Sequence, residues 1–416
     1  MTTVMRRSTR MAQEFDEGEW YMEFQISNRM RGMKPSIIRE ILKQMSDPEL
    51  ISFAGGNPAA DSFPAADIAR FSAELLENDP VGVLQYSVTE GVPAAREAVR
   101  KFANRHDEVV KDNDDLILVS GSQQILDFVT KCLCNEGDVV AVENPAFLGA
   151  FLSFRCYGAK LVGVSMEEDG VDLTELEKVF SANPKPRFFY CIPNFQNPTG
   201  RTMSAEKRKA VYELSVKYGV PILEDDPYGE LRISGQPVAP IKSLDITGNV
   251  IYAASFSKIM CPGMRLAYCV CDKALMKSLV IAKQGSDVHT NVWSQRICAQ
   301  LLTRTDMDRH IEEIRQIYRE KAEYMMRLLD EKCPQIRYVR PEGGMFLWGT
   351  LPDGIDMQEF VKRCLERKLA VVPGNAFLVD ETQPCQNFRM NFSTPTKANI
   401  EKGVEIMAAV LAEMDR

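Results

Sequence analysis

One lysine, Lys258, lies among residue types that suit covalent chemistry with an aldehyde. Two serines, Ser255 and Ser257, precede it, and Arg265 follows seven residues later. Apolar, strand-like runs lie on both sides of this segment, which places the lysine on a short loop between two buried strands. Burial and a neighbouring cation lower the pKa of a lysine, and the neutral amine can form a Schiff base. The segment therefore predicts a reactive amine.

Serine hydroxyls and an arginine are also groups that bind a phosphate. Pyridoxal 5′-phosphate (PLP) combines an aldehyde and a phosphate in one small molecule, so this segment could hold it. A surface loop with an ordinary basic residue is the alternative, because Ser-x-Ser-Lys alone is a weak signal. The rest of the chain has to decide between the two.

Seven short apolar runs indicate strands that are buried on both faces. They are residues 116–120, 138–143, 160–164, 187–192, 220–224, 249–254 and 266–271. Helical patterns lie between many of them, at residues 122–135, 172–181 and 204–218. This alternation predicts an α/β fold with a mainly parallel, doubly wound, seven-stranded sheet. The last two runs are joined by a loop alone, which predicts one antiparallel strand.

After about residue 286 the pattern changes. Helices are predicted at residues 292–302, 307–329 and 397–414, and shorter strands at 336–340, 345–350, 370–372 and 387–391. This order predicts a smaller α+β domain. We expect a large domain over residues 58–300, a small domain over 301–416, and an N-terminal segment, residues 1–57, that packs beside the small domain.

Polar residues follow several predicted strands, at the edge where open α/β sheets bind ligands. Ser122 and Gln123 open a helix directly after the first strand. Free amides and the positive end of the helix dipole favour a phosphate there, although a plain N-cap serine is the alternative. Asn197 precedes Pro198, so it is held extended and can direct its amide into a site, unless the segment is an ordinary turn.

An acidic run and an isolated arginine complete the set. Asp225 and Tyr228 follow the strand at 220–224. A carboxylate facing a pyridine nitrogen keeps it protonated, and a phenol nearby could reach the ring hydroxyl. The alternative for these consecutive acids is capping or a cation site. Arg389 lies in an apolar strand and needs an anion, either a substrate carboxylate or a structural ion pair.

Ser-Gln, Asn-Pro-Thr-Gly, Asp-x-x-Tyr and Ser-x-Ser-Lys with its downstream arginine occur in that order. With this ordered set the chain resembles the PLP-dependent aminotransferases of fold type I, class I/II, from about Pro35 to the C-terminus. Residues 35–40, 53–58, 84–86, 344–348 and 372–377 are similar to the branch that contains 2-aminoadipate and kynurenine aminotransferases. The resemblance implies the PLP-transferase fold of type I and PLP as cofactor.

The same resemblance implies a role for each matching position. Lys258 forms the internal aldimine and then moves the proton between Cα and the C4′ atom of the cofactor. Asp225 pairs with the pyridine nitrogen, and Tyr228 and Asn197 bond the ring oxygen. Phe147 stacks on the ring, at a position where many relatives have tyrosine. The phosphate is expected on Ser122, Gln123, Ser255, Ser257 and Arg265.

Substrate contacts are implied in the same way. Arg389 clamps the α-carboxylate, and Asn197 and Gly56 also contact the substrate. Arg39, on a mobile N-terminal helix, meets the distal end of the substrate, where a second cation would suit 2-oxoglutarate or glutamate. A solvated helix arginine is the alternative. Tyr21 and Phe24 are further candidates for this pocket.

Composition limits other possibilities. The net charge of −8 argues against a nucleic-acid role, and no apolar run reaches the roughly 18 residues of a membrane span. The sequence also lacks a signal-peptide pattern. Eleven cysteines without a Cys-x-x-Cys pair suit reduced thiols in the cytosol better than zinc or disulfides. Three scattered histidines argue against a metal centre.

We therefore expect a cytoplasmic PLP-dependent aminotransferase with ping-pong kinetics. An L-amino acid would donate its amino group and a 2-oxo acid, with 2-oxoglutarate the expected acceptor, would receive it. The donor stays open among 2-aminoadipate, aromatic, branched-chain and broad-range substrates. Tyr86 would reach the phosphate or substrate of the other subunit in a homodimer. The alternatives are a PLP-dependent β-lyase or decarboxylase, and a PLP-binding sensor, although no DNA-binding module is predicted.

Overall fold

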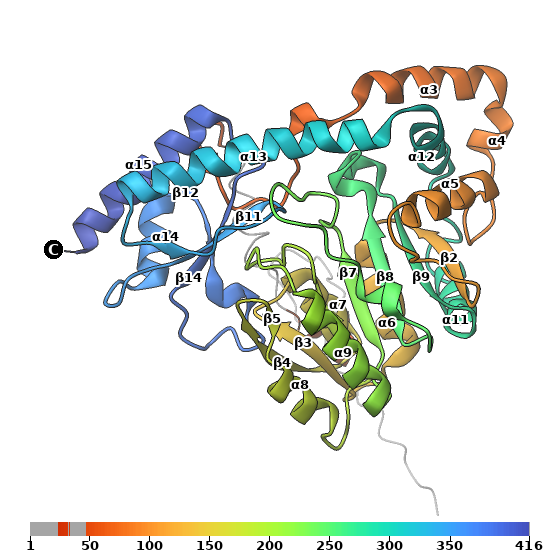
Figure 1. The fold of residues 1–416 in the computed structure, drawn as a ribbon, viewed down its shortest axis with the longest axis horizontal. Coiled ribbons are helices and arrows are strands. Elements are labelled where there is room, and N and C mark those ends of the chain that lie inside the picture. Colours follow the sequence, from red (N-terminus) through yellow and green to blue (C-terminus); the bar gives the residue numbers. More distant parts are fainter. Residues whose placement is uncertain (1–23, 32, 34–46, 416) are drawn as a thin grey trace, which may run out of the picture.

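A single eight-stranded sheet forms the centre of the larger part of the molecule in this computed structural model, which describes residues 24–31, 33 and 47–415 (Figure 1). The strand order is β2-β9-β8-β7-β6-β3-β4-β5. The strands are β2 (Asp114–Val119), β3 (Val139–Asn144), β4 (Lys160–Glu167), β5 (Gly170–Val171), β6 (Phe189–Cys191), β7 (Ile222–Asp226), β8 (Val250–Ser255) and β9 (Ala267–Asp272).

The predicted fold class is confirmed. Strands β3, β4, β6, β7 and β8 pair in parallel, and β9 runs antiparallel to both of its neighbours, β2 and β8. All seven predicted strands form. The eighth, β5, pairs antiparallel with the end of β4, and the sequence gives no sign of it because two residues are too few for an apolar pattern.

Helices cover the sheet, and several of them begin after a residue whose side chain caps the first turn. They are α5 (Pro93–Ala103), α6 (Ser122–Leu133), α7 (Leu148–Cys156), α8 (Leu173–Phe180), α9 (Ala205–Tyr218), α10 (Ile241–Leu244), α11 (Lys273–Gln284) and α12 (Val292–Arg304). Ser204 caps α9 by accepting from the Lys207 amide, and Gly219 ends it in the left-handed region. Two helices, α3 (Ala65–Asn78) and α4 (Pro80–Leu84), precede them.

A second, four-stranded antiparallel sheet lies at the other end of the molecule (Figure 1). Its strands are β10 (Arg337–Tyr338), β11 (Phe346–Thr350), β13 (Val372–Pro373) and β14 (Asn387–Asn391). Helices α14 (Met357–Glu366) and α15 (Lys397–Met414) accompany it, and β1 (Ile51–Ser52) pairs in parallel with β12 (Leu369–Ala370). The four-residue helix α1 (Asn28–Arg31) lies in the described N-terminal piece.

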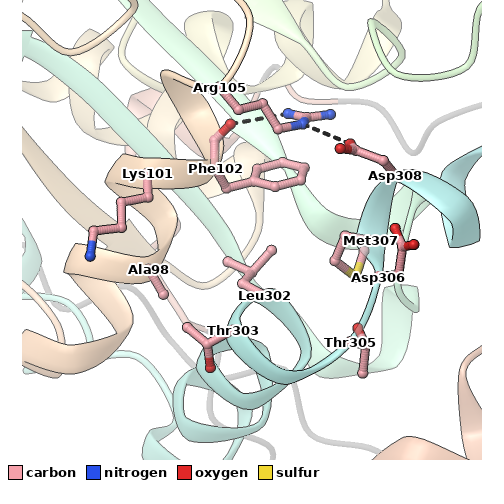
Figure 2. A pocket seen from close by; sticks show the side chains of 10 residues that line it. All are labelled: Ala98, Lys101, Phe102, Arg105, Leu302, Thr303, Thr305, Asp306, Met307 and Asp308. Atoms are coloured by element: carbon pink, nitrogen blue, oxygen red, sulfur yellow. Dashed lines mark hydrogen bonds and ion pairs between the residues drawn. The ribbon is translucent and has the colours of Figure 1, made fainter.

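One long helix, α13 (Met307–Lys332), extends from α12 beside the large sheet to the four-stranded sheet (Figure 1). Its first residues and α5 line a pocket of about 290 Å³ (Figure 2). Arg105 lies along one edge of this pocket and donates to Asp308 at 3.1 Å and to the Phe102 carbonyl at 3.0 Å. The charge of Arg105 is thus already paired with Asp308, and this side chain is not left free to bind a ligand in the pocket.

Three further observations concern the part of the chain that the structure describes. The eleven cysteines are all unpaired. No described helix has the length and apolar character needed to cross a membrane. No three histidine, cysteine, aspartate or glutamate side chains in the described ranges are grouped to hold a metal ion.

A buried ion cluster ties β2 to the segment before β8. The Lys242 side chain is 1% exposed, and its Nζ donates to Asp114 at 2.8 Å and Asp245 at 2.9 Å. Lys242→Met would leave two buried carboxylates without their cation, so we expect the free energy of unfolding to fall by about 3–5 kcal/mol. Chemical denaturation measures this change. Lys209→Met, at a surface lysine on α9, is the control and should change it by less than about 0.5 kcal/mol; equal effects would contradict the prediction.

Candidate active site

Lys258 lies where the sequence predicts it, on a short turn between β8 and β9 at the carboxyl edge of the large sheet. Its Nζ donates to the Gly56 carbonyl at 2.7 Å, which brings the N-terminal segment onto the lysine. Burial lowers the pKa of Lys258 to about 8, and the nearby cations Arg389 and Arg265 add to this effect. The amine therefore loses its proton at a lower pH than an ordinary lysine does.

Asp225 lies at the end of β7 and is 2% exposed. Its Oδ2 accepts a hydrogen bond from the Tyr190 hydroxyl at 2.9 Å, whereas its Oδ1 is buried without a partner. Burial raises the pKa of Asp225 to about 7, and the Tyr190 hydrogen bond opposes this rise. A buried, unpartnered carboxylate oxygen is costly, so this atom is where a ligand donor would be stabilising.

Three predicted residues from distant parts of the chain form one cluster beside the lysine. Arg389 donates to Asn197 Oδ1 at 2.8 Å and to the Ala54 carbonyl at 2.7 Å, and Asn197 Nδ2 lies 3.5 Å from the Tyr228 hydroxyl. Burial lowers the pKa of Arg389 to about 10. Its Nε is buried without a partner, and its guanidinium carbon lies 4.2 Å from the ring centroid of Phe346.

Arg389 therefore keeps capacity for an anion. Among the residues that the structure describes, its hydrogen bonds go to an amide oxygen and a carbonyl rather than to a carboxylate. The sequence left two interpretations of Arg389, a substrate carboxylate and a structural ion pair. The described residues do not provide the carboxylate that a structural ion pair would need. A planar guanidinium with an unused Nε suits a carboxylate that binds through two oxygens.

The predicted phosphate residues surround the start of α6. Gly121, with φ of 90°, precedes Ser122, and a Cβ at Gly121 would overlap the Arg265 guanidinium. The Phe256 amide donates to the Leu266 carbonyl at 3.1 Å, which brings the serine turn beside Arg265. These contacts place a cation, two hydroxyls and free helix amides in one region, the set that an anion requires.

Gln123 differs from the expectation in one respect. Its side-chain amide donates to the Gly149 carbonyl at 2.7 Å and to Ser153 Oγ at 2.6 Å, both on α7. The Gln123 side chain thus holds α7 in place, and only the backbone amide of Gln123 is left to bind a phosphate. Phe147 precedes α7 and its ring folds against Gly149, where a Cβ would overlap it. Glycine at 149 is what permits this ring position.

Some predicted residues do not join this cluster within one chain. Tyr86 is 81% exposed and lies edge-on to His289, with 5.7 Å between ring centroids. Phe24 is 74% exposed. Arg39 and Tyr21 lie outside the described residues, so their predicted substrate contacts stay predictions.

The three consecutive acids of β7 do not form a cation site. Both oxygens of Glu224 accept backbone amides, from Ile241 at 2.8 Å and Lys242 at 2.7 Å. Asp226 accepts from the Tyr252 hydroxyl at 2.9 Å. Because side chains alternate along a strand, Asp225 points to the opposite face from both.

Two buried residues near this cluster, Tyr190 and Glu143, were not among the residues predicted from the sequence. Tyr190 looks like an ordinary core tyrosine in an apolar strand, and no sequence signal marks its contact with Asp225.

Glu143 could have been found from the sequence, because it is a polar residue at the end of an apolar strand, shortly before Pro145. Its Oε2 accepts from the Ile192 amide and from Gln196 Nε2, both at 3.1 Å, and its Oε1 is buried without a partner. Gln196 immediately precedes Asn197, so Glu143 anchors the loop that carries it.

Glu143 predicts a dependence of stability on pH. Burial raises its pKa to about 8, so the folded state keeps the proton while the unfolded state releases it above about 4.5. Stability from this group is complete below pH 4.5 and falls as pH rises toward 8, by at most about 1.4 kcal/mol per pH unit. Glu143→Gln should therefore gain stability relative to the wild type as pH rises. Glu366→Gln, at a surface carboxylate, is the control for denaturation curves; a pH-independent difference for Glu143→Gln would contradict the prediction.

The chain is similar to known proteins over most of its length. The family model for aminotransferases of class I and II matches residues 48–407. The aromatic-amino-acid aminotransferase 1 of Thermococcus litoralis is 36% identical over 414 residues, which cover 98% of this chain and 99% of that protein.

Two solved structures share the fold. The kynurenine aminotransferase of Pyrococcus horikoshii, in complex with PMP, is 36% identical with a TM-score of 0.89, over 93% of this chain and 97% of that one. The α-aminoadipate aminotransferase LysN of Thermus thermophilus, in complex with N-(5′-phosphopyridoxyl)-L-leucine, is 34% identical with a TM-score of 0.86, over 94% and 97%. The chain therefore belongs to the class I and II aminotransferases, which are PLP-dependent transaminases.

Proposed function

We propose that this aminotransferase moves the amino group of an L-amino acid, of the aromatic or 2-aminoadipate type, to 2-oxoglutarate by ping-pong kinetics at Lys258. The arrangement of Lys258, Asp225 and Arg389 around one buried site carries the proposal. The similar proteins are named for aromatic amino acids, kynurenine and α-aminoadipate, which supports this donor class. Their names support transfer of an amino group over β-elimination, decarboxylation or sensing.

The residues present fit PLP. The unpartnered Oδ1 of Asp225 offers an acceptor to a ring nitrogen, and the region around Ser122, Ser255 and Arg265 offers donors to a phosphate. When bound, the cofactor supplies an aldehyde and an electron-withdrawing ring that stabilises negative charge at the α-carbon of the substrate. Asp225, in its ionised form, would keep a proton on that ring nitrogen.

Side chains of this chain carry out proton transfer and substrate binding. The neutral Nζ of Lys258, whose pKa burial lowers to about 8, would take the proton from the α-carbon of the amino acid and deliver it to C4′, the former aldehyde carbon of the cofactor. Arg389 binds the α-carboxylate and fixes the orientation of the α-carbon. Asn197 links Arg389 to Tyr228, so carboxylate binding and the ring-oxygen contact are held in one cluster.

We also propose a cytoplasmic homodimer in which Tyr86 completes the site of the second subunit. Tyr86 follows α4, and along this segment Val81, Leu84 and Val88 are 71%, 74% and 51% exposed. Exposed apolar side chains gathered in one segment suit an interface. The division at residues 57 and 300 stays a proposal too; the pairing of β1 with β12 supports an N-terminal segment beside the small domain.

Added glutamate should convert bound PLP to pyridoxamine phosphate in the wild type, because the amino group is transferred and stays on the cofactor. Lys258→Ala should abolish this conversion, and Lys209→Ala, at the α9 surface, should leave it unchanged. Absorbance spectra followed by chromatography of the released cofactor measure it. A twenty-amino-acid screen with 2-oxoglutarate then identifies the donor. Wild-type conversion in Lys258→Ala would disprove the assignment of the lysine, and release of free ammonia or CO₂ without formation of pyridoxamine phosphate would disprove transfer.

Arg389→Lys should raise KM for every amino acid and 2-oxo acid about 10- to 100-fold, because a single ammonium cannot replace a guanidinium that binds both carboxylate oxygens. The value of kcat should change less, and the affinity for PLP should change little. Steady-state kinetics with several substrates measure the split. Arg309→Lys, at an arginine 77% exposed, is the control. A KM increase confined to one substrate would count against an α-carboxylate contact.

A further inference from the structure

Tyr190 is the strongest feature of the site that the roles above do not use. It is fully buried on β6, and the register of the parallel sheet places it opposite Leu223 of β7. Leu223 and Asp225 lie two residues apart, so their side chains point to the same face of the sheet. The Tyr190 hydroxyl therefore meets Asp225 from the neighbouring strand, on the face that carries the unpartnered Oδ1.

Packing fixes the position of this hydroxyl. The Tyr190 ring lies edge-to-face against Phe154 of α7, with 5.5 Å between centroids, and Phe154 packs in the same way against Phe188 at 5.3 Å. An ionised carboxylate can only accept, so the hydroxyl must donate to Asp225 Oδ2. One carboxylate oxygen is occupied by a rigid donor, and the other is left free in a buried place.

We propose that Tyr190 is a positioning residue for Asp225: its hydroxyl occupies Oδ2 and so directs Oδ1 to the ring nitrogen of the cofactor. The inference rests on the proposed role of Asp225. The hydrogen bond also has an electrostatic effect, because it lowers the pKa of a carboxyl that burial raises to about 7. Without the hydroxyl, more of Asp225 is protonated near neutral pH, and a neutral carboxyl pairs poorly with a protonated ring nitrogen.

The chain contains a matched control, a second buried tyrosine that donates to Asp226, the residue next to Asp225. Tyr252 of β8 is also a buried tyrosine, and it donates to Asp226 Oδ2 at 2.9 Å, the same distance as in the Tyr190 pair. Tyr252 pairs with Glu224 in the sheet, so this second pair lies on the face opposite Asp225. Tyr252→Phe removes a comparable hydrogen bond without touching the site.

The test compares Tyr190→Phe with Tyr252→Phe by titrating PLP into the apo-protein and following bound-cofactor absorbance. Tyr190→Phe should weaken PLP binding about 10- to 100-fold, the range of a lost hydrogen bond to a charged group, and Tyr252→Phe should leave it within about twofold. Thermal unfolding should show similar losses for both. Equal PLP affinities in the two variants would overturn the proposal.

The pH dependence separates positioning from simple packing. In the wild type, PLP affinity should fall as pH drops through about 7, where Asp225 takes up a proton. In Tyr190→Phe this fall should start at higher pH, because the pKa of Asp225 rises further. The same cofactor is titrated into both proteins, so its own ionisation cancels in the comparison. An unshifted profile would indicate that the hydroxyl only fills space and would refute the proposal.

The variant Asp225→Asn separates the proposed role of Asp225 from the proposed role of Tyr190. If this variant keeps wild-type PLP affinity and activity, the proposed role of Asp225 itself is wrong. If it loses affinity while Tyr190→Phe does not, the inference about Tyr190 alone is wrong. Should Tyr190→Phe fail to fold, the double variant Tyr190→Phe/Asp225→Asn gives the answer. Its affinity should equal that of Asp225→Asn, because the hydroxyl acts through the missing carboxylate, and a further loss would overturn the proposal.

Discussion

Ionisable groups buried at the carboxyl edge of the large sheet are the constraint on which the site depends. Burial brings the pKa of Lys258 down to about 8 and that of Asp225 up to about 7, so both groups can exchange protons near neutral pH. Burial of this kind destabilises the fold unless the atoms find partners. The structure supplies some partners from its own chain, whereas Asp225 Oδ1 and Arg389 Nε have no hydrogen-bond partner among the described residues.

Helix α13 connects the loops that carry these groups. His310 donates to the carbonyl of Ile259, directly after Lys258, at 2.8 Å, and Arg315 donates to the Glu230 carbonyl, two residues after Tyr228, at 2.7 Å. Lys321 reaches the Ser393 carbonyl at 2.8 Å, four residues after Arg389. One rigid helix therefore holds three loop segments, at Glu230, Ile259 and Ser393, and so helps to fix the relative positions of the side chains that they carry.

Side chains alternate between the two faces of the sheet along β7, so neighbouring acidic residues have different surroundings. Asp225 faces the site, while Glu224 and Asp226 face the other side, where they accept backbone amides and the Tyr252 hydroxyl. The two faces of one strand thus carry a carboxylate with one unpartnered oxygen and two carboxylates that hold the surrounding loops. Buried polar networks of this kind specify one arrangement of a core because a partly satisfied network is costly.

The amino-acid sequence by itself determined the elements and most of the chemical types. Apolar runs fixed the seven longer strands, and Lys258, Asp225, Asn197 and Arg389 stand out because polar residues at strand ends, or in an apolar strand, need a reason. Only the tertiary structure decided which atoms remain free. The contact of Tyr190 with Asp225, the use of the Gln123 side chain by α7, and the anchoring of the Asn197 loop by Glu143 join residues 26 to 53 positions apart. Such partnerships depend on strand order, register and facing, which no local pattern of residue types encodes.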